Sequence, residues 1–430
     1  MTGITSLPCE IVVSIFRNLD DVRCISSVLL TCRYFYACYN ERPSIGAEIL
    51  RRRIPSALLP YSVALIEASR HPFLPAVGAV LQLLHDLYEH PDQMANKLHS
   101  LPISGLLELG HIHVIIDTLV NDFATDAWKL LCQEAEDFPT SVSLSSTEYL
   151  RFCRAFYRAE LFFRVYRGVN QTTLERIGGA EARLFFSRVA PWENEQLGCV
   201  YDFLDKRFSH AARDVLAHDV EFGEYNIDYL SIGSENEWTQ CSISRGLSFV
   251  HQVMNEKSYD SKMALLKPIF FGNIYLLLHN ALSACSAEFC DNLGIWEGTL
   301  EEISDEEMEL LIERSIRQDT DHGPFSAWHS EYKYISRNSW VMAEFKAGLR
   351  ERAYVLWDND RMDHLGMLDL YEFAPEDPSH MCHHEEEYSK IQKSFEERSQ
   401  IYRQGGRGYW SPNDTSRIEW SSSNQLNENE

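Results

Sequence analysis

The sequence predicts an all-α protein. Apolar residues recur at helical spacing over most of the chain, as in Ile11, Ile15 and Leu19. No run of residues alternates between polar and apolar in the manner of a set of strands. The chain of 430 residues exceeds the usual size of a single core. We therefore expect a small N-terminal unit of three helices joined to a larger, irregular α-helical domain.

The charge of the chain is strongly negative and unevenly distributed. The formal net charge is −25, and residues 1–55 hold seven Lys/Arg against five Asp/Glu, so the remainder carries −27. Such a body is repelled by nucleic acid phosphates and by anionic membranes, so neither is expected as a partner. A basic protein partner is favoured, although an acidic surface that only keeps the chain soluble explains the same charge.

Cysteine usage indicates a reducing compartment. The eleven cysteines are scattered singly without a Cys-x-x-Cys pair, so we expect free thiols in the cytoplasm, the nucleus or both. The first residues lack a basic stretch followed by an apolar run, so no secretory signal is expected. The apolar stretch Ile269–Leu278 has ten residues, whereas a bilayer requires about 20, so it predicts a buried helix.

The N-terminal unit has more apolar residues than it can bury alone. Leu7-Pro8 predicts a helix start, with Pro8 at the first helical position and Ser6 as a cap. A second short helix follows Asp20-Asp21, and a third contains Cys32 and Phe35. A segment of this length exposes much of its surface. Its apolar surplus must be covered either by the rest of the chain or by another protein.

In the body, Arg51-Arg52-Arg53, Pro55 and Pro60 mark a joint, and helical patterns follow. Two capping boxes are expected, Ser145 with Glu148 and Ser304 with Glu307. The aromatic helix after Ser145 is apolar almost all round, which predicts a central buried helix. The polar residues 411–430 are expected to be a disordered tail. The expected helices cover residues 80–88, 112–131 (one helix or a pair), 147–166, 195–220, 247–254, 262–282 (bent at Pro268) and 305–318, with one or two more between 328 and 357.

The order and spacing of the N-terminal residues resemble the F-box, the module that docks proteins onto the Skp adaptor of cullin–RING ubiquitin ligases. The resemblance rests on Leu7-Pro8-x-Glu10-Ile11, on Ile15, Leu19 and Ile25, and on Cys32-Arg33-x-Phe35. It implies an F-box at residues 1–50 and a partner-binding body at 55–410. One departure is that Ile49-Leu50 stands where the family often has Trp. The adaptor-binding residues implied by the resemblance are Leu7, Pro8, Ile11, Ile15, Leu19, Ile25, Val28, Cys32, Arg33 and Phe35.

The whole layout is similar to that of filamentous-fungal F-box proteins, with Pro191-Trp192-Glu193 and His218–Glu221 in an undivided helical body. The resemblance implies a substrate-recognition adaptor of a Skp–cullin–F-box ligase that presents a client protein and is not itself an enzyme. Two alternatives stay open. One is an F-box scaffold or regulator without a ligase role, and the other is an all-α enzyme or metal-binding protein.

Chemistry-bearing motifs are few. The paired Cys/His ligands of a RING domain, about eight in number, do not occur, and neither do phosphate-binding loops or hydrolase elbows. The tract His380–Glu387 is the best metal candidate, and His218-Asp219-x-Glu221 could place a base beside a carboxylate. The acidic helix Glu301–Glu313 could dock a basic client, although a solvated helix face is the favoured explanation. We therefore expect no catalytic residue, metal or cofactor.

Overall fold

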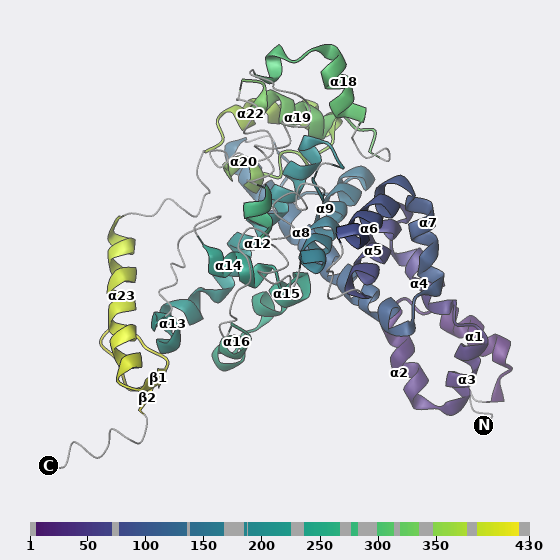
Figure 1. The fold of residues 1–430 in the computed structure, drawn as a ribbon, viewed down its shortest axis with the longest axis horizontal. Helices are drawn as coiled ribbons and strands as arrows, with labels where there is room; N and C mark the ends of the chain where they lie inside the picture. The colour runs from purple at the N-terminus through teal and green to yellow at the C-terminus, as the bar shows by residue number, and fades with distance from the viewer. Residues whose placement is uncertain are drawn as a thin grey trace.

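The computed structural model of this chain is built almost entirely of α-helices, which confirms the predicted all-α fold class (Figure 1). Two short strands at the C-terminal end are the only ones in the described part of the chain. The structure describes residues 6–70, 77–135, 138–166, 185–186, 188–224, 236–266, 277–282, 299–313, 319–334, 347–375 and 385–420.

The first helices form a unit at one end of the molecule (Figure 1). Helix α1 begins at Cys9, one residue later than predicted, with Pro8 as its N-cap. The Pro8 carbonyl accepts hydrogen bonds from the amides of Ile11 and Val12. No side chain caps this helix. The helices are α1 (Cys9–Arg17), α2 (Arg23–Thr31), α3 (Arg33–Glu41) and α4 (Ile45–Arg53).

The predicted joint after residue 50 is the end of a helix, and hydrogen bonds link this end to neighbouring segments. Arg51, Arg52 and Arg53 form the last turn of α4, which therefore crosses the expected boundary. Arg51 donates to the side chain of Asn96, Arg52 to the Arg17 carbonyl and Arg53 to the Asp20 carbonyl. The buried residues of the N-terminal unit belong to the same apolar core as those of the body.

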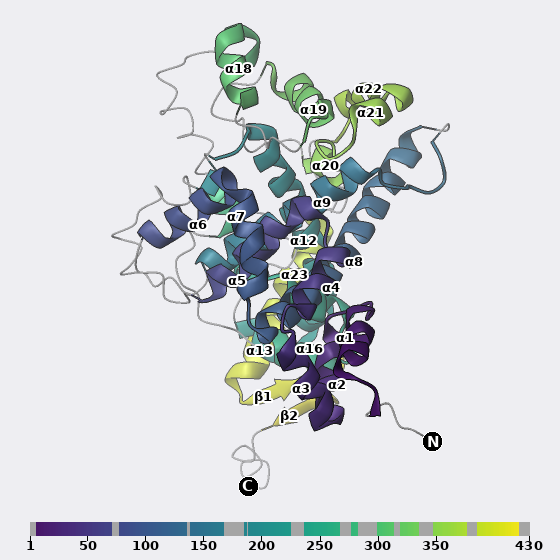
Figure 2. The same ribbon diagram turned by 90° about the vertical axis from the view of Figure 1, so that its right-hand side faces the viewer.

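The centre of the body is formed by helices α8, α9 and α12 (Figures 1 and 2). Nearly every residue of α9 is buried, as its aromatic pattern predicts. Its capping box is confirmed, because the Ser145 amide donates to Glu148 Oε2 at 2.8 Å and the Glu148 amide donates to Ser145 Oγ at 3.1 Å. The elements of this part are η2 (Ser56–Leu58), α5 (Leu59–Arg70), α6 (Val77–Glu89), α7 (Pro91–Asn96), η3 (Lys97–Ser100), α8 (Ile103–Glu134), α9 (Ser146–Tyr166), α12 (Pro191–His218), α13 (Val220–Glu224), α14 (Glu237–Ile243), α15 (Leu247–Asn255) and α16 (Tyr259–Leu266).

Helix α8 is one continuous helix of 32 residues, where the sequence left one helix or a pair open. Among the described residues it is the one helix long and apolar enough to cross a membrane by length and composition. In this structure, 56% of its most apolar window is buried inside the molecule, as in the core helix of a soluble protein.

Helices α18, α19, α21 and α22 lie at the opposite end of the molecule from the N-terminal unit, whereas α23 lies beside α13 (Figure 2). The acidic helix begins at Asp305 as expected, while the side chain of its Glu307 lies outside the described residues. Pro268 also lies outside them. The elements are η7 (Leu300–Glu302), α18 (Asp305–Glu313), α19 (Gly323–Tyr332), α20 (Ala347–Glu351), α21 (Asn359–Leu365), α22 (Met367–Glu372) and α23 (Glu385–Arg403).

The expectation of a disordered tail from residue 411 is wrong for its first ten residues. Strand β2 (Ile418–Trp420) pairs antiparallel with β1 (Gly406–Gly408). Trp410 and Ile418 bury their side chains against Val220 of α13. These apolar contacts hold the segment in place, and its mostly polar composition does not predict them. Residues 421–430 lie outside the described part.

Candidate partner-binding surface at the N-terminus

Helix α1 has apolar residues on both of its faces. Val12, Val13 and Phe16 are buried in the core, which fixes the orientation of the helix. Ile11 and Ile15, four residues apart, consequently point away from the core and are 49% and 40% exposed. Full burial of an exposed isoleucine contributes about 1.5–3 kcal/mol, so covering the exposed half of each side chain would contribute roughly 1 kcal/mol. Two such isoleucines close together on one helix are candidates for a binding surface.

Helices α2 and α3 complete this surface but do not use every predicted residue. Ile25 is only 1% exposed and belongs to the core, so its assignment to the adaptor-binding surface is wrong. It is buried because α2 lies against α3 and α8. The other predicted residues keep some exposure. Pro8 and Arg33 are exposed, while Leu7, Leu19, Val28, Cys32 and Phe35 are half-buried.

Two further residues of this unit are exposed although the sequence did not single them out. Leu30 at the end of α2 is 88% exposed and Tyr36 of α3 is 56% exposed. Together with Ile11 and Ile15 they make up half of the large apolar side chains that are exposed in the described chain. The density of apolar side chains in the sequence indicates a surplus here, but helical spacing alone does not say which of them face outward.

An aromatic contact and a hydrogen bond hold α1 and α3 together. The rings of Phe16 and Phe35 meet edge to face, with centroids 5.8 Å apart. The Tyr34 hydroxyl donates to the carbonyl of Leu7 at 2.6 Å, which ties the segment before α1 to α3. The apolar side chains named above are therefore presented by a packed unit and need little reordering on binding.

Three cysteines of the described chain have raised pKa values, which disfavours the reactive thiolate. A hydrogen bond with Cys38, together with burial, raises the pKa of Cys9 to about 11. Burial raises the pKa of Cys153 to about 12 and also that of Cys241 to about 12. A thiol with a raised pKa stays protonated at neutral pH, and the thiolate is the nucleophilic form. These three cysteines are therefore poorly suited to accept ubiquitin or any other group covalently.

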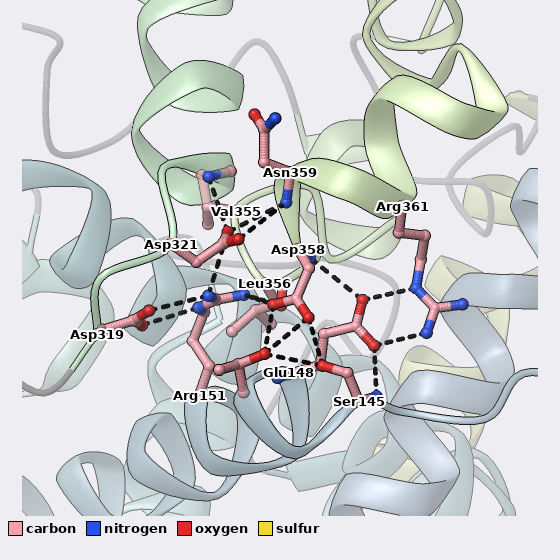
Figure 3. A network of polar contacts seen from close by, with 12 residues as sticks. Ser145, Glu148, Arg151, Asp319, Asp321, Val355, Leu356, Asp358, Asn359 and Arg361 are labelled. Atoms are coloured by element: carbon pink, nitrogen blue, oxygen red, sulfur yellow. Dashed lines mark hydrogen bonds and ion pairs between the residues drawn. The ribbon is translucent and has the colours of Figure 1, made fainter.

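The polar network around the start of α9 is a structural junction (Figure 3). The fully buried Arg151 forms ion pairs with Asp319, Asp321 and Asp358. Glu148 pairs with Arg361 on the other side of the same turn. The network joins α9 to the segments that precede α19 and α21. Its guanidinium groups are engaged by carboxylates from within the chain, so the network holds these segments together.

His218 and Asp219, considered as a base and carboxylate pair, bond to different partners. The His218 ring nitrogen Nδ1 lies 3.0 Å from the Trp410 carbonyl, and Asp219 accepts from the Tyr259 hydroxyl at 2.8 Å. The metal candidate His380–His384 lies outside the described residues. Within the described ranges, no three His, Cys, Asp or Glu side chains are arranged to hold a metal ion.

The fold and the exposed apolar residues together define an all-α protein with an N-terminal protein-interaction unit. Residues 4–45 match the family model described as F-box-like, so the chain carries an F-box-like domain that is followed by a helical body. F-box domains are protein-interaction modules that typically bind Skp-type adaptors. No curated protein and no solved structure matches the chain.

Proposed function

We propose that this protein is the substrate-recognition adaptor of a Skp–cullin–F-box ubiquitin ligase. Its N-terminal unit binds the Skp-type adaptor and its helical body binds the client. The observation that carries the proposal is the exposure of Ile11 and Ile15 on a helix whose other face is buried. The F-box-like match over the same residues supports it. Ubiquitin transfer is then accelerated by holding the client near an E2 enzyme carried elsewhere in the complex.

The adaptor interface is expected to centre on the exposed and half-buried residues of α1 to α3. Ile11 and Ile15 are the central anchors, and Leu7, Pro8, Leu19, Val28, Cys32, Arg33 and Phe35 border them, with Leu30 and Tyr36 added and Ile25 removed. An interface of ordinary size, about 1,600 Å² in total, would be enough for stable binding. The eight cysteines of the described chain are free thiols, which fits a cytoplasmic or nuclear site of action.

Titration of the intact chain with a purified Skp-type adaptor tests the proposal. The double variant Ile11→Ala/Ile15→Ala is expected to bind at least about thirtyfold more weakly, because two anchors lose their burial. Ile312→Ala is the matched control, since Ile312 is an equally exposed isoleucine on α18. Adaptor binding that is unaffected by the double substitution, or that is absent in the wild type, would contradict the proposal.

A scaffold or regulator that binds the adaptor without a ligase role is the second candidate. Such a protein would use the same adaptor interface. It would differ from a ligase adaptor only in that its bound client is not ubiquitinated. Reconstitution with cullin, E2 and ubiquitin distinguishes the two, because a ligase adaptor supports transfer to its client or to itself and a scaffold does not.

A further inference from the structure

A pocket of about 310 Å³ lies between the start of α12, the end of α18 and the start of α19. Its apolar walls are formed by Trp192, Ile312, Pro324 and Phe325. The rings of Trp192 and Phe325 meet edge to face, with centroids 5.2 Å apart, and Ile312 remains 38% exposed. The volume is at the lower end of the range of natural ligand sites, so the pocket has room for one long side chain.

The acidic side chains at this pocket outnumber the basic groups that pair with them. Those that line the pocket belong to Glu193, Asp319 and Asp321. Two buried guanidinium groups, of Arg151 and Arg154, pair with Asp319, and Arg151 also pairs with Asp321 and Asp358. Two positive charges therefore face three carboxylates in this network, which leaves one negative charge in excess.

Asp321 has one carboxylate oxygen with spare hydrogen-bonding capacity. Its Oδ1 accepts from the amides of Gly323 and Asn359 at 2.9 and 3.1 Å, and it also contacts Arg151 (Figure 3). Among the described residues, Oδ2 has a single long contact, at 3.4 Å from the Asn359 amide. Each carboxylate oxygen has two lone pairs, so Oδ2 can accept hydrogen bonds from a donor that enters the pocket.

The face of α18 that ends at this pocket is acidic. Asp305, Glu309 and Ile312 are spaced four and three residues apart, so they lie on one face of the helix. Ile312 lines the pocket, and both acidic residues are exposed. Neither of them pairs with a basic side chain in the part of the chain that the structure describes. The two carboxylates therefore attract positive charge toward the pocket.

We propose that this pocket binds a basic side chain, arginine or lysine, of a client protein. The proposal rests on the adaptor function proposed above, and it specifies the chemistry of the client. The cationic head donates to Oδ2 of Asp321, while the apolar stem packs between Ile312 and Phe325. The aromatic walls add to the attraction, because the face of an aromatic ring attracts cations. An acidic segment would be repelled by the same carboxylates.

The proposal is tested with nonapeptides that are selected on the intact chain from a random display library, labelled, and titrated by fluorescence anisotropy. Thr320→Lys places a cation of the chain itself at the pocket from an exposed position. It is expected to weaken binding at least about tenfold. Thr415→Lys is the matched control, because Thr415 is also an exposed threonine and the change in net charge is the same, but it does not line the pocket. Equal melting temperatures of the two variants show that both are folded.

The need for a positive charge is tested on the peptide itself. Citrulline in place of arginine, or acetyl-lysine in place of lysine, removes the charge and keeps a side chain of similar length. Either replacement at the required position is expected to weaken binding at least about tenfold. Two results would overturn the proposal: no enriched peptide that depends on a basic residue, or equal binding to the Thr320→Lys and Thr415→Lys chains. Adaptor titration of the wild type is read separately, so a failed pocket is distinguishable from a failed adaptor function.

Discussion

Val22 occupies the space in which a side chain on Gly110 would begin. A Cβ atom built on Gly110 of α8 would lie 2.4 Å from Val22 Cγ1. Gly46 of α4 makes a second close approach, because its Cβ would lie 2.8 Å from Leu106 Cδ1. Val22 is fully buried and β-branched, so it cannot rotate away. These two glycines allow the N-terminal unit to sit directly against α8, which fixes its position on the body.

Gly110→Ala is expected to destabilise the protein despite the higher helix propensity of alanine. The added methyl group must displace Val22 or separate the helices, and overpacking of this kind costs about 1–3 kcal/mol. Urea unfolding of the intact chain measures the change. Gly78→Ala on α6 is the control, because nothing lies within 4 Å of its Cβ position. A Gly110→Ala chain as stable as the Gly78→Ala chain would show that the contact yields without cost.

Local sequence patterns predicted those helices whose start and buried face are marked by residues close together in the chain. The Ser145–Glu148 capping box and the aromatic residues after it were sufficient to place α9. The strands β1 and β2 were missed because no alternation marks them, and they form through contacts with Val220, almost two hundred residues earlier in the chain. Such long-range contacts cannot be read from a window of neighbouring residues.

The same limit applies to the exposure of residues at the candidate site. The residue surplus at the N-terminus was visible, and Ile11 and Ile15 are indeed exposed. Whether an apolar residue on a short helix faces a partner or the body depends on what packs beside it. Helix α8 lies against α2, where Ile25 is buried, while Leu30 at the end of the same helix stays exposed.

Ile25→Ala and Ile11→Ala are expected to have opposite effects. The first leaves a cavity in the core and lowers the free energy of unfolding by about 2–4 kcal/mol, with little change in adaptor affinity. The second weakens adaptor binding about tenfold or more and changes stability by less than about 1 kcal/mol. Urea unfolding and isothermal titration on each variant measure the two quantities. A loss of adaptor affinity in a fully folded Ile25→Ala chain would show that Ile25 belongs to the adaptor interface after all.

His279 is expected to make the protein acid-sensitive. Burial, aided by the positive charge of Arg350, lowers the pKa of His279 from 6.5 to about 3. Between these values the unfolded chain binds a proton that the folded chain does not, so stability falls as the pH falls below about 6.5. Between pH 7.5 and pH 5, the free energy of unfolding of the wild type should fall by about 2 kcal/mol more than that of the His279→Gln variant.

Unfolding by urea at the two pH values measures this difference. His210→Gln, which changes an exposed histidine of α12, serves as the control and should keep the wild-type dependence on pH. If His279→Gln retains the full loss of stability, another group is responsible for the acid sensitivity.

Arg398 is expected to hold the C-terminal elements on the body. Its side chain is fully buried, and its guanidinium donates to the carbonyls of Leu216 and Asp219, which the end of α12 leaves without helical partners. Arg398→Met removes these donors and leaves buried carbonyls unsatisfied, at about 1–3 kcal/mol each.

Because α23, β1 and β2 contact the body through α13 and the end of α12, the loss of stability should be local and not global. We expect faster amide exchange over residues 385–420 and unchanged exchange in α8 and α9. Arg403→Met is the control, since Arg403 is exposed on the same helix. Uniformly faster exchange over the whole chain would instead show that the C-terminal elements unfold together with the central helices.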